Sequence, residues 1–441
     1  MFETLKNAFK NKDVRRKILI TLALLFIYRL GCWVPIPGID AIYYADQLKA
    51  SGGNVDGLLG LLNGITGSAL QNGALFAIGI TPYINASIIL QLLTVAIPRL
   101  QEWQKQGDDG KKKITQVTRY ITLALAAAQA VAVTVSYARA NALSNTVFGP
   151  MTQSWVIGIF VAVIMIMGSM LTMWLGERIT DYGIGNGISL LIFIGIIATA
   201  AHSIVANITS AVGGDEMAIW QLIGFVIMVV AVFMLIVFID GAERRVPVQY
   251  AKQIKGRKQY GGQSTFIPIK VNASGVMPII FATALITFPQ MIAQLVAPDS
   301  GFYIWWATWL GAGSIYPFYY ILVALLILGF SYFYAGIEFN PEDISRNIQQ
   351  YGGFINGIRP GRPTTEYLSR ISKRLTLFGA IFLAFIALVP SVIFAAVLGN
   401  TSSLINAFSA TGMLIVVSVA LEFEKQLQSQ LMMKQYKGFL K

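Results

Sequence analysis

The chain has 441 residues, of which 55% are hydrophobic and only 12% are charged, and its mean hydropathy is +0.63. A soluble domain of this length needs far more charge to cover its surface, so these values exclude a soluble globular protein. The single cysteine, Cys32, excludes an internal disulfide. The single histidine, His202, argues against a histidine-based metal site and against a histidine-dependent catalytic triad.

The N-terminal stretch 1–17 is basic, with six Lys or Arg residues and no cleavage pattern, so no removable signal peptide is expected. Phe2, Leu5 and Phe9 lie roughly on one helical face. This pattern suits a short amphipathic helix lying on the membrane surface. A solvated basic tail explains the same residues equally well, and both alternatives stay open.

Apolar runs long enough to cross about 30 Å of hydrocarbon recur along the chain. We count ten of them and predict an all-α polytopic membrane protein with ten transmembrane helices. The predicted spans are 18–35, 74–97, 118–138, 154–175, 184–206, 217–239, 273–297, 315–337, 374–397 and 402–421.

Basic residues are distributed unevenly between the connectors. Thirty of the 33 Lys and Arg residues fall on one alternating set of connectors, and the other set carries only Lys49 and Arg139. The positive-inside rule therefore places both termini in the cytosol. Arg29 is the one basic residue left within a span, beside Tyr28 and Trp33, and we interpret it as snorkelling to the outer interface.

Ten spans divide into five plus five with opposite orientation, which is the arrangement expected of inverted repeats with a pathway between them. We therefore predict two five-helix halves joined by an external hinge. The predicted parts are a cytosolic N-terminus at 1–17, an N-terminal half at 18–206, a hinge at 207–216, a C-terminal half at 217–421 and a cytosolic tail at 422–441.

The external connector 36–73 contains a leucine-rich run that is too short and too glycine-rich to span a bilayer. Each glycine in it costs a helix about 1 kcal/mol relative to alanine. The run is either an interfacial loop helix or a re-entrant segment that is held loosely in a cavity. Its apolar residues, spaced for a short amphipathic helix, are Leu58, Leu59, Leu61, Leu62 and Ile65.

Two basic connectors on the cytosolic side, 240–272 and 338–374, are longer than topology requires. The first predicts a hairpin that presents a basic tip to an anionic partner, and the second holds Arg359 on a rigid turn between Gly357 and Pro360. Orientation signals or contacts with anionic lipids are the plainer explanation. The basic residues of the first connector include Arg244, Arg245, Lys252, Lys255, Arg257 and Lys258.

Several kinds of chemistry are missing from the sequence. GDDGKKK at 107–113 has the wrong spacing for a P-loop, and no G-x-S-x-G nucleophile motif occurs. Ion-coupled transporters usually bury acidic residues near the midplane, whereas Glu177, Asp240, Glu338 and Glu422 all fall at cytosolic ends. We therefore predict a pore rather than an enzyme, with neither a cofactor nor a metal ion.

Long motifs along nearly the whole chain resemble the SecY family, the channel subunits of the bacterial protein translocase. They are WVPIPGID at 33–40, FAIGITPYINASIILQLLT at 76–94, WLGERITDYGIGNGISLLIFIGI at 174–196, RRVPVQYAK at 244–252, QSTFIPIKVNASGVMPIIFA at 263–282 and GGFINGIRPGRPTTEYLSRISKRLTLFGA at 352–380.

The resemblance implies an hourglass channel whose waist is a ring of aliphatic side chains. The ring would comprise Ile80, Ile84, Ile188, Ile192, Ile280 and Ile415. On their own, such isoleucines are explained by packing against lipid or neighbouring helices. The run 410–415, which contains Ile415, departs from the usual family pattern. The resemblance also identifies the region near 57–68 as a plug helix.

The resemblance further implies a lateral gate between spans two and three and spans seven and eight. Asn85, Ser87, Gln91 and Gln129 would face this gate. Arg359 and the basic residues of 240–272 would dock the SecA motor or the ribosome. Other implied partners are SecE-like and SecG-like small membrane subunits, signal sequences, nascent polypeptides and anionic lipids.

The function implied is a protein-conducting channel in the bacterial cell membrane. It would pass unfolded secretory polypeptides across the membrane and release transmembrane segments sideways into lipid. The alternative is a ten-span secondary transporter for a small solute.

Overall fold

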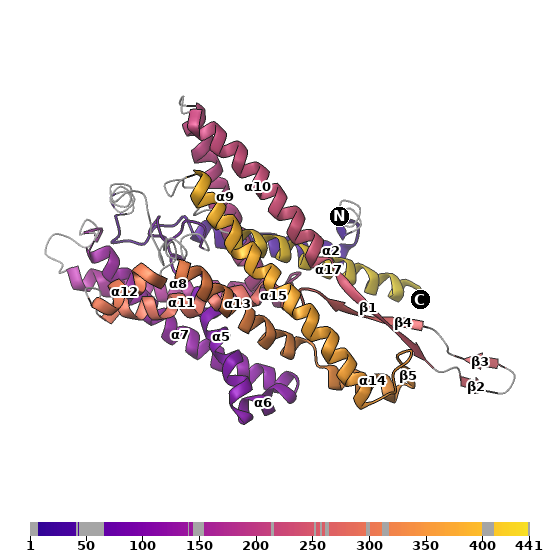
Figure 1. Cartoon of the computed structure of the whole chain (residues 1–441). Helices are drawn as coiled ribbons and strands as arrows, with labels where there is room; N and C mark the ends of the chain where they lie inside the picture. The colour runs from indigo at the N-terminus through magenta and orange to yellow at the C-terminus, as the bar shows by residue number, and fades with distance from the viewer. Residues whose placement is uncertain are drawn as a thin grey trace. The chain divides into compact units, whose positions relative to one another are not determined.

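The computed structural model describes residues 8–40, 43, 66–139, 141–143, 154–212, 216–250, 253–255, 258–260, 264–296, 300–310, 317–398 and 410–439. Within these ranges the chain is mostly helical, with a few short strands (Figure 1). It divides into two compact units, and each is described by itself. The first unit is Met1–Phe225, Ala284–Tyr316 and Phe394–Lys441, and the second is Val226–Thr283 and Pro317–Ile393.

A helix overlaps each predicted span. These helices are α2 (Lys12–Gly31), α5 (Thr81–Ala96), α7 (Asp108–Arg139), α8 (Ser154–Tyr182), α9 (Gly187–Val212), α10 (Glu216–Asp240), α11 (Met277–Val296), α13 (Pro317–Glu338), α15 (Arg362–Leu398) and α17 (Ala410–Phe439). Among the described residues, six helices are long and apolar enough to cross a membrane, or seven if α5 and the following helix form one bent span. The count of ten transmembrane spans and the hourglass stay predictions.

The chain bends by 102° where α5 gives way to α6 (Pro98–Lys105), which the ribbon shows turning away from α5 (Figure 1). Ile97 between them is extended, with φ −108° and ψ 112°. A residue before proline is disfavoured in the helical region, so Pro98 ends α5 and begins α6 at its first turn. The bend coincides with the end of the apolar run.

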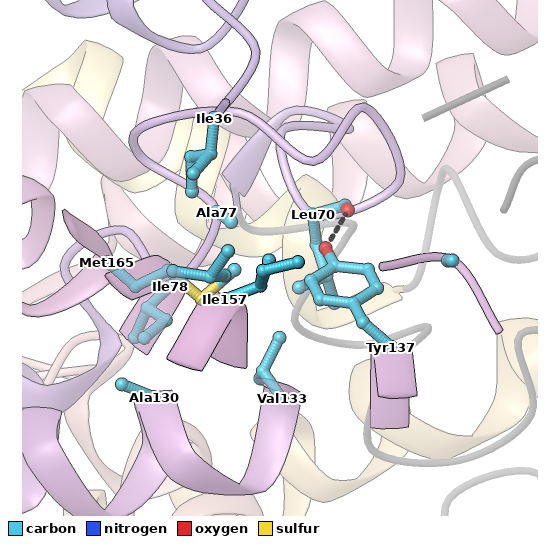
Figure 2. Packing of buried hydrophobic residues seen from close by; sticks show 11 residues of the cluster. Ile36, Leu70, Ala77, Ile78, Ala130, Val133, Tyr137, Ile157 and Met165 are labelled. Atoms are coloured by element: carbon cyan, nitrogen blue, oxygen red, sulfur yellow. Dashed lines mark hydrogen bonds between the residues drawn. The ribbon is translucent and has the colours of Figure 1, made fainter. Parts of the chain in front are cut away.

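The core of the first unit gathers side chains from α7, α8 and the chain leading into α5. Figure 2 shows Tyr137 of α7 reaching Leu70, whose carbonyl accepts a hydrogen bond from the Tyr137 hydroxyl at 2.6 Å. Residues far apart in the sequence are joined here, because the bond fixes the connector after α2 against α7. The buried cluster contains Ile36, Leu70, Ala77, Ile78, Ala130, Val133, Tyr137, Ala142, Ile157, Val161 and Met165.

Helices α8 and α9 approach each other closely at two glycines. A β-carbon on Gly187 would collide with the Gly176 carbonyl oxygen and would lie 2.7 Å from the β-carbon of Ile179. The intervening turn is also tied down, because the Gly187 amide donates to the Thr180 hydroxyl at 2.9 Å. Side chains larger than hydrogen at position 187 would therefore push the start of α9 away from α8.

The C-terminal helix α17 packs against the N-terminal part of the chain. It continues from the predicted span into the tail, to Phe439, where the sequence analysis assigned no secondary structure. Buried side chains of α17 and of the N-terminal part form one cluster, and Ile184 of the turn before α9 belongs to the same cluster. The members are Ala8, Val14, Ile18, Ile184 and Leu427, with Phe423 and Leu431 partly buried against them.

The second unit contains a three-stranded antiparallel sheet with the order β4-β1-β5. Strand β1 alternates exposed side chains with buried Val246 and Val248, which pack on α14 (Pro341–Gln350) and the start of α15. The predicted hairpin is thereby confirmed, and β2 and β3 lie beyond β1 and β4 in Figure 1. The strands are β1 (Glu243–Tyr250), β2 (Gln253–Lys255), β3 (Lys258–Tyr260), β4 (Ser264–Lys270) and β5 (Gly353–Phe354).

Short helix α12 (Gly301–Leu310) follows α11 and carries three tryptophans. The Trp306 indole donates to the Ile286 carbonyl at 3.2 Å, which ties α12 back to α11.

Candidate functional site

Two of the isoleucines predicted to form a pore ring both lie close to Gly176 of α8 in the first unit. A β-carbon on Gly176 of α8 would lie 3.3 Å from Cγ1 of Ile188 and 3.6 Å from Cδ1 of Ile80. Ile80 immediately precedes α5, and Ile188 is in the first turn of α9. The start of α5 is held by α8, because the buried Ser169 hydroxyl donates to the Gly79 carbonyl at 3.1 Å. The absent side chain at Gly176 leaves room for both isoleucines.

The remaining ring positions lie on four helices, α5, α9, α11 and α17. The Ile84 amide donates to the Ile80 carbonyl at 3.1 Å, so these residues are one helical turn apart, as the sequence predicts. Ile192 and Ile415 are buried in the first unit, where α9 and α17 pack together. Ile280 belongs to α11 in the second unit. The convergence of all six on one axis stays a prediction.

The candidate gate residues differ in burial. Asn85 of α5 and Gln129 of α7 are buried, Ser87 is half-buried and Gln91 is exposed. Gln129 is only 3% exposed, and within the described part of the chain its Oε1 has no hydrogen-bond partner. A buried amide oxygen without a partner destabilises the packed state of the helix that carries it. The side chain is therefore a weak point within α7.

The five leucine and isoleucine positions of the predicted plug lie outside the described residues. The structure describes the chain again from residue 66. There the Nη1 atom of Arg29 donates to the Gly67 carbonyl at 3.0 Å. The Arg29 guanidinium therefore turns toward the backbone of the external connector, and its snorkelling to the outer interface stays a prediction. Arg29 and Gly67 are 38 positions apart, so no local sequence pattern predicts their contact.

Arg359 is exposed, and hydrogen bonds from buried hydroxyl groups to backbone carbonyls hold the turn that carries it. The Thr364 hydroxyl donates to the Arg359 carbonyl at 2.9 Å, and Thr364 is itself buried. Gly357 has φ +80°, a conformation that favours glycine. The Ser345 hydroxyl also donates to the Gly361 carbonyl at 2.9 Å. The rigid turn predicted from the sequence is confirmed.

The basic residues of the hairpin in the second unit belong to two pairs of strands, β1–β4 and β2–β3. Arg244 and Arg245 lie on β1, and Lys255 pairs with Lys258 across the β2–β3 hairpin. Arg245 is partly engaged already, since its Nε lies 2.7 Å from Glu243 Oε1 and its guanidinium lies 4.8 Å from the ring centre of Phe266. Lys252 and Arg257 lie outside the described residues.

Sequence reasoning missed an ion pair between α7 and α8. Arg119 donates to both carboxylate oxygens of Glu177, at 3.0 and 2.7 Å. The two residues are 58 positions apart, so no local pattern signals the contact. Among the described residues no cluster of three or more His, Cys, Asp or Glu side chains could hold a metal ion.

Comparison with known proteins decides the family. The SecY family model matches residues 74–424. Protein translocase subunit SecY of Streptomyces coelicolor is 45% identical over 100% of both chains. The chain belongs to the SecY family. The Mycobacterium tuberculosis protein of the same name is 40% identical, again over 100% of both chains.

Solved structures share the fold at low sequence identity. A structure described as that of a protein conducting channel has a TM-score of 0.66 at 20% identity, and the match covers 94% of this chain and 92% of the other. Sec61 in the canine ribosome-channel complex has a TM-score of 0.61 at 19% identity, with the same coverage. Membership of the SecY family makes the chain a protein-conducting translocation channel, and the secondary-transporter alternative is not supported.

Proposed function

We propose that the chain passes unfolded secretory polypeptides through an aliphatic constriction and releases transmembrane segments sideways into lipid. The observation that supports this proposal is that Ile80 and Ile188, which belong to two separate helical segments, both lie close to Gly176. With Ile84, Ile192, Ile280 and Ile415 they would form the waist of an hourglass between two inverted five-helix halves.

An aliphatic waist suits a channel that must accept any sequence. Narrow hydrophobic constrictions block ions by dewetting. Isoleucine side chains also make few directional contacts, so an unfolded chain can slide past them. Ring and substrate therefore need no chemical complementarity, and no covalent step is required of this chain.

The segment 57–68 would act as a plug that seals the external funnel at rest. In another SecY protein, the plug domain is described as stabilising the closed state of the translocation channel and maintaining a membrane seal. The glycines of this segment weaken its helix, which favours displacement when a polypeptide enters.

The lateral gate would use the buried amide of Gln129, whose Oε1 has no hydrogen-bond partner within the described part of the chain. Each interhelical hydrogen bond within a membrane contributes roughly 0.6 kcal/mol, so an unpaired Gln129 weakens a closed seam only modestly. A signal sequence that supplies apolar contacts could then shift the gate toward its open state. Asn85, Ser87 and Gln91 would contribute to the same seam.

Energy for transport would come from partners. The exposed Arg359 and the basic hairpin would dock the SecA motor or the ribosome, with salt-sensitive binding to ribosomal RNA. SecE-like and SecG-like subunits would complete the channel, and anionic lipids would contact its basic side. The chain would sit in the bacterial cell membrane with both termini in the cytosol. Related channels have been solved on ribosomes, including the yeast Ssh1 complex.

The decisive test is a crosslink from a stalled secretory chain. A photoreactive amino acid at Ile84 should capture the translocating chain, because Ile84 would line the constriction. The same substitution at Ile159 of α8, which is 57% exposed in the isolated chain, serves as the control and should capture lipid or neighbouring subunits instead. Capture at Ile159 but not Ile84 would refute the proposed path.

A further inference from the structure

Arg29 is the only charged residue within the predicted spans other than those at their ends. A charged side chain inside a membrane-spanning helix is costly and needs a partner. The side chain is half-buried, and its Nη1 atom donates to the Gly67 carbonyl at 3.0 Å. The bond therefore joins α2 to the last residues of the segment that we propose as the plug.

The backbone at Gly67 fits this contact closely. Gly67 has φ +69°, and a β-carbon there would collide with Nη1 of Arg29 and lie 3.1 Å from the Gly195 carbonyl oxygen of α9. Only glycine suits both the conformation and the space. The backbone of residue 67 is thus held between α2 on one side and α9 on the other.

The neighbouring Thr66 is fixed as well. Its side chain is fully buried, and a β-carbon on Gly79 would lie 2.8 Å from its Cγ2 methyl group. Gly79 directly precedes the ring residue Ile80. Residues 66–67 therefore contact three parts of the first unit: α2, α9 and the chain entering α5.

We propose that Arg29 is a positioning residue that anchors the C-terminal end of the plug and so keeps the resting channel sealed. The inference rests on the proposed plug function of 57–68. A hydrogen bond from a charged donor is stronger than a neutral one, yet it is a single bond that an entering polypeptide can break. Arginine suits the role better than lysine because its planar guanidinium projects donors in fixed directions toward the carbonyl.

The anchor can be tested by hydrogen exchange on the full-length chain with its co-purifying small subunits. In Arg29→Met, amides of residues 66–75 should exchange about tenfold faster or more, which is the loss expected for one charged hydrogen bond. Arg29→Lys should give a smaller increase. The control Arg139→Met removes an exposed cation at the end of α7 and should leave these amides unchanged.

Protection in α8 should match that of the original protein in every variant, which excludes general unfolding as the cause. Unchanged exchange at 66–75 in a folded Arg29→Met variant would overturn the anchor. The same proteins are then placed in planar bilayers, where Arg29→Met should raise the resting ion conductance. Faster exchange with unaltered conductance would overturn the sealing role. Failure of the proposed transport path itself would appear separately, as a missing crosslink at Ile84 in the original protein.

Discussion

One hydroxyl group at Tyr137 joins distant parts of the first unit. It donates to the Leu70 carbonyl at 2.6 Å across 67 positions of sequence, and both residues are buried (Figure 2). The Leu70 carbonyl also accepts a hydrogen bond from the Gly73 amide at 3.1 Å, but burial keeps out the water that would otherwise replace a lost donor. The bond therefore matters more for stability than an exposed hydrogen bond of the same length.

Tyr137→Phe should lower the free energy of unfolding by about 0.5–1.5 kcal/mol, because it removes one of the two hydrogen bonds that the Leu70 carbonyl accepts while keeping the ring in place. Thermal unfolding of the purified protein measures the change. Tyr120→Phe on the same helix is the control, since Tyr120 is 74% exposed and should change stability by no more than about 0.5 kcal/mol. Equal effects of the two substitutions would contradict the role of this bond.

At the residue scale, the sequence predicts side chains whose role depends on local geometry. The turn that carries Arg359 is such a case, because its glycines and proline are adjacent in sequence. The partner of Arg29 lies 38 positions away on an irregular connector, and only the folded chain shows it. Burial of Gln129 likewise depends on the packing of α7, which periodicity alone does not reveal.

At the element scale, the contact between α8 and α9 depends on two glycines. Gly187 lies where a β-carbon would collide with the Gly176 carbonyl, and backbone cannot move aside as a flexible side chain does. The next residue is Ile188, one of the predicted ring positions. Close packing of these helices therefore fixes where α9 begins and where its isoleucines stand.

Gly187→Ala should destabilise the protein by about 1–3 kcal/mol, as expected for overpacking, and should displace the start of α9. Gly224→Ala in α10 is the matched control, because a β-carbon there meets no atom within 4 Å. Alanine favours helix over glycine by about 1 kcal/mol, so the control should be neutral or stabilising. Thermal unfolding of both variants checks the difference, and a neutral Gly187→Ala would refute close packing at this site.

The elements themselves were predictable because an apolar run of membrane length has few alternatives to a helix. Helix ends were less predictable. Helix α15 begins at Arg362 rather than near 374, since its polar first turns bury Leu368 against the sheet. Helix α17 likewise extends past 421, where Leu427 joins the cluster around Ile18. Hydropathy detects only the apolar part of such helices.

At the scale of the whole molecule, family membership and the uneven distribution of basic residues both favour a channel whose transport is driven by partners. The chain supplies a passage, and in our proposal basic surfaces on one predicted side receive the partners that drive transport. Sequence motifs predict this role because they are long and run through nearly the whole chain. The arrangement of the two halves is not encoded locally, since residue-level similarity between them is weak, and it stays a prediction.

Coupling to the motor is expected to depend on Arg359. Arg359→Glu should reduce SecA-driven transport about tenfold or more, because it places a repulsive charge at a docking surface. The fold should be unaffected, since the side chain is exposed and the turn is held through its backbone by Thr364. Arg346→Glu, an exposed position on α14, is the matched control and should transport normally. Translocation into vesicles with purified motor measures both. Equal loss in the two variants would indicate a general requirement for positive charge, whereas normal transport by Arg359→Glu would refute the docking role.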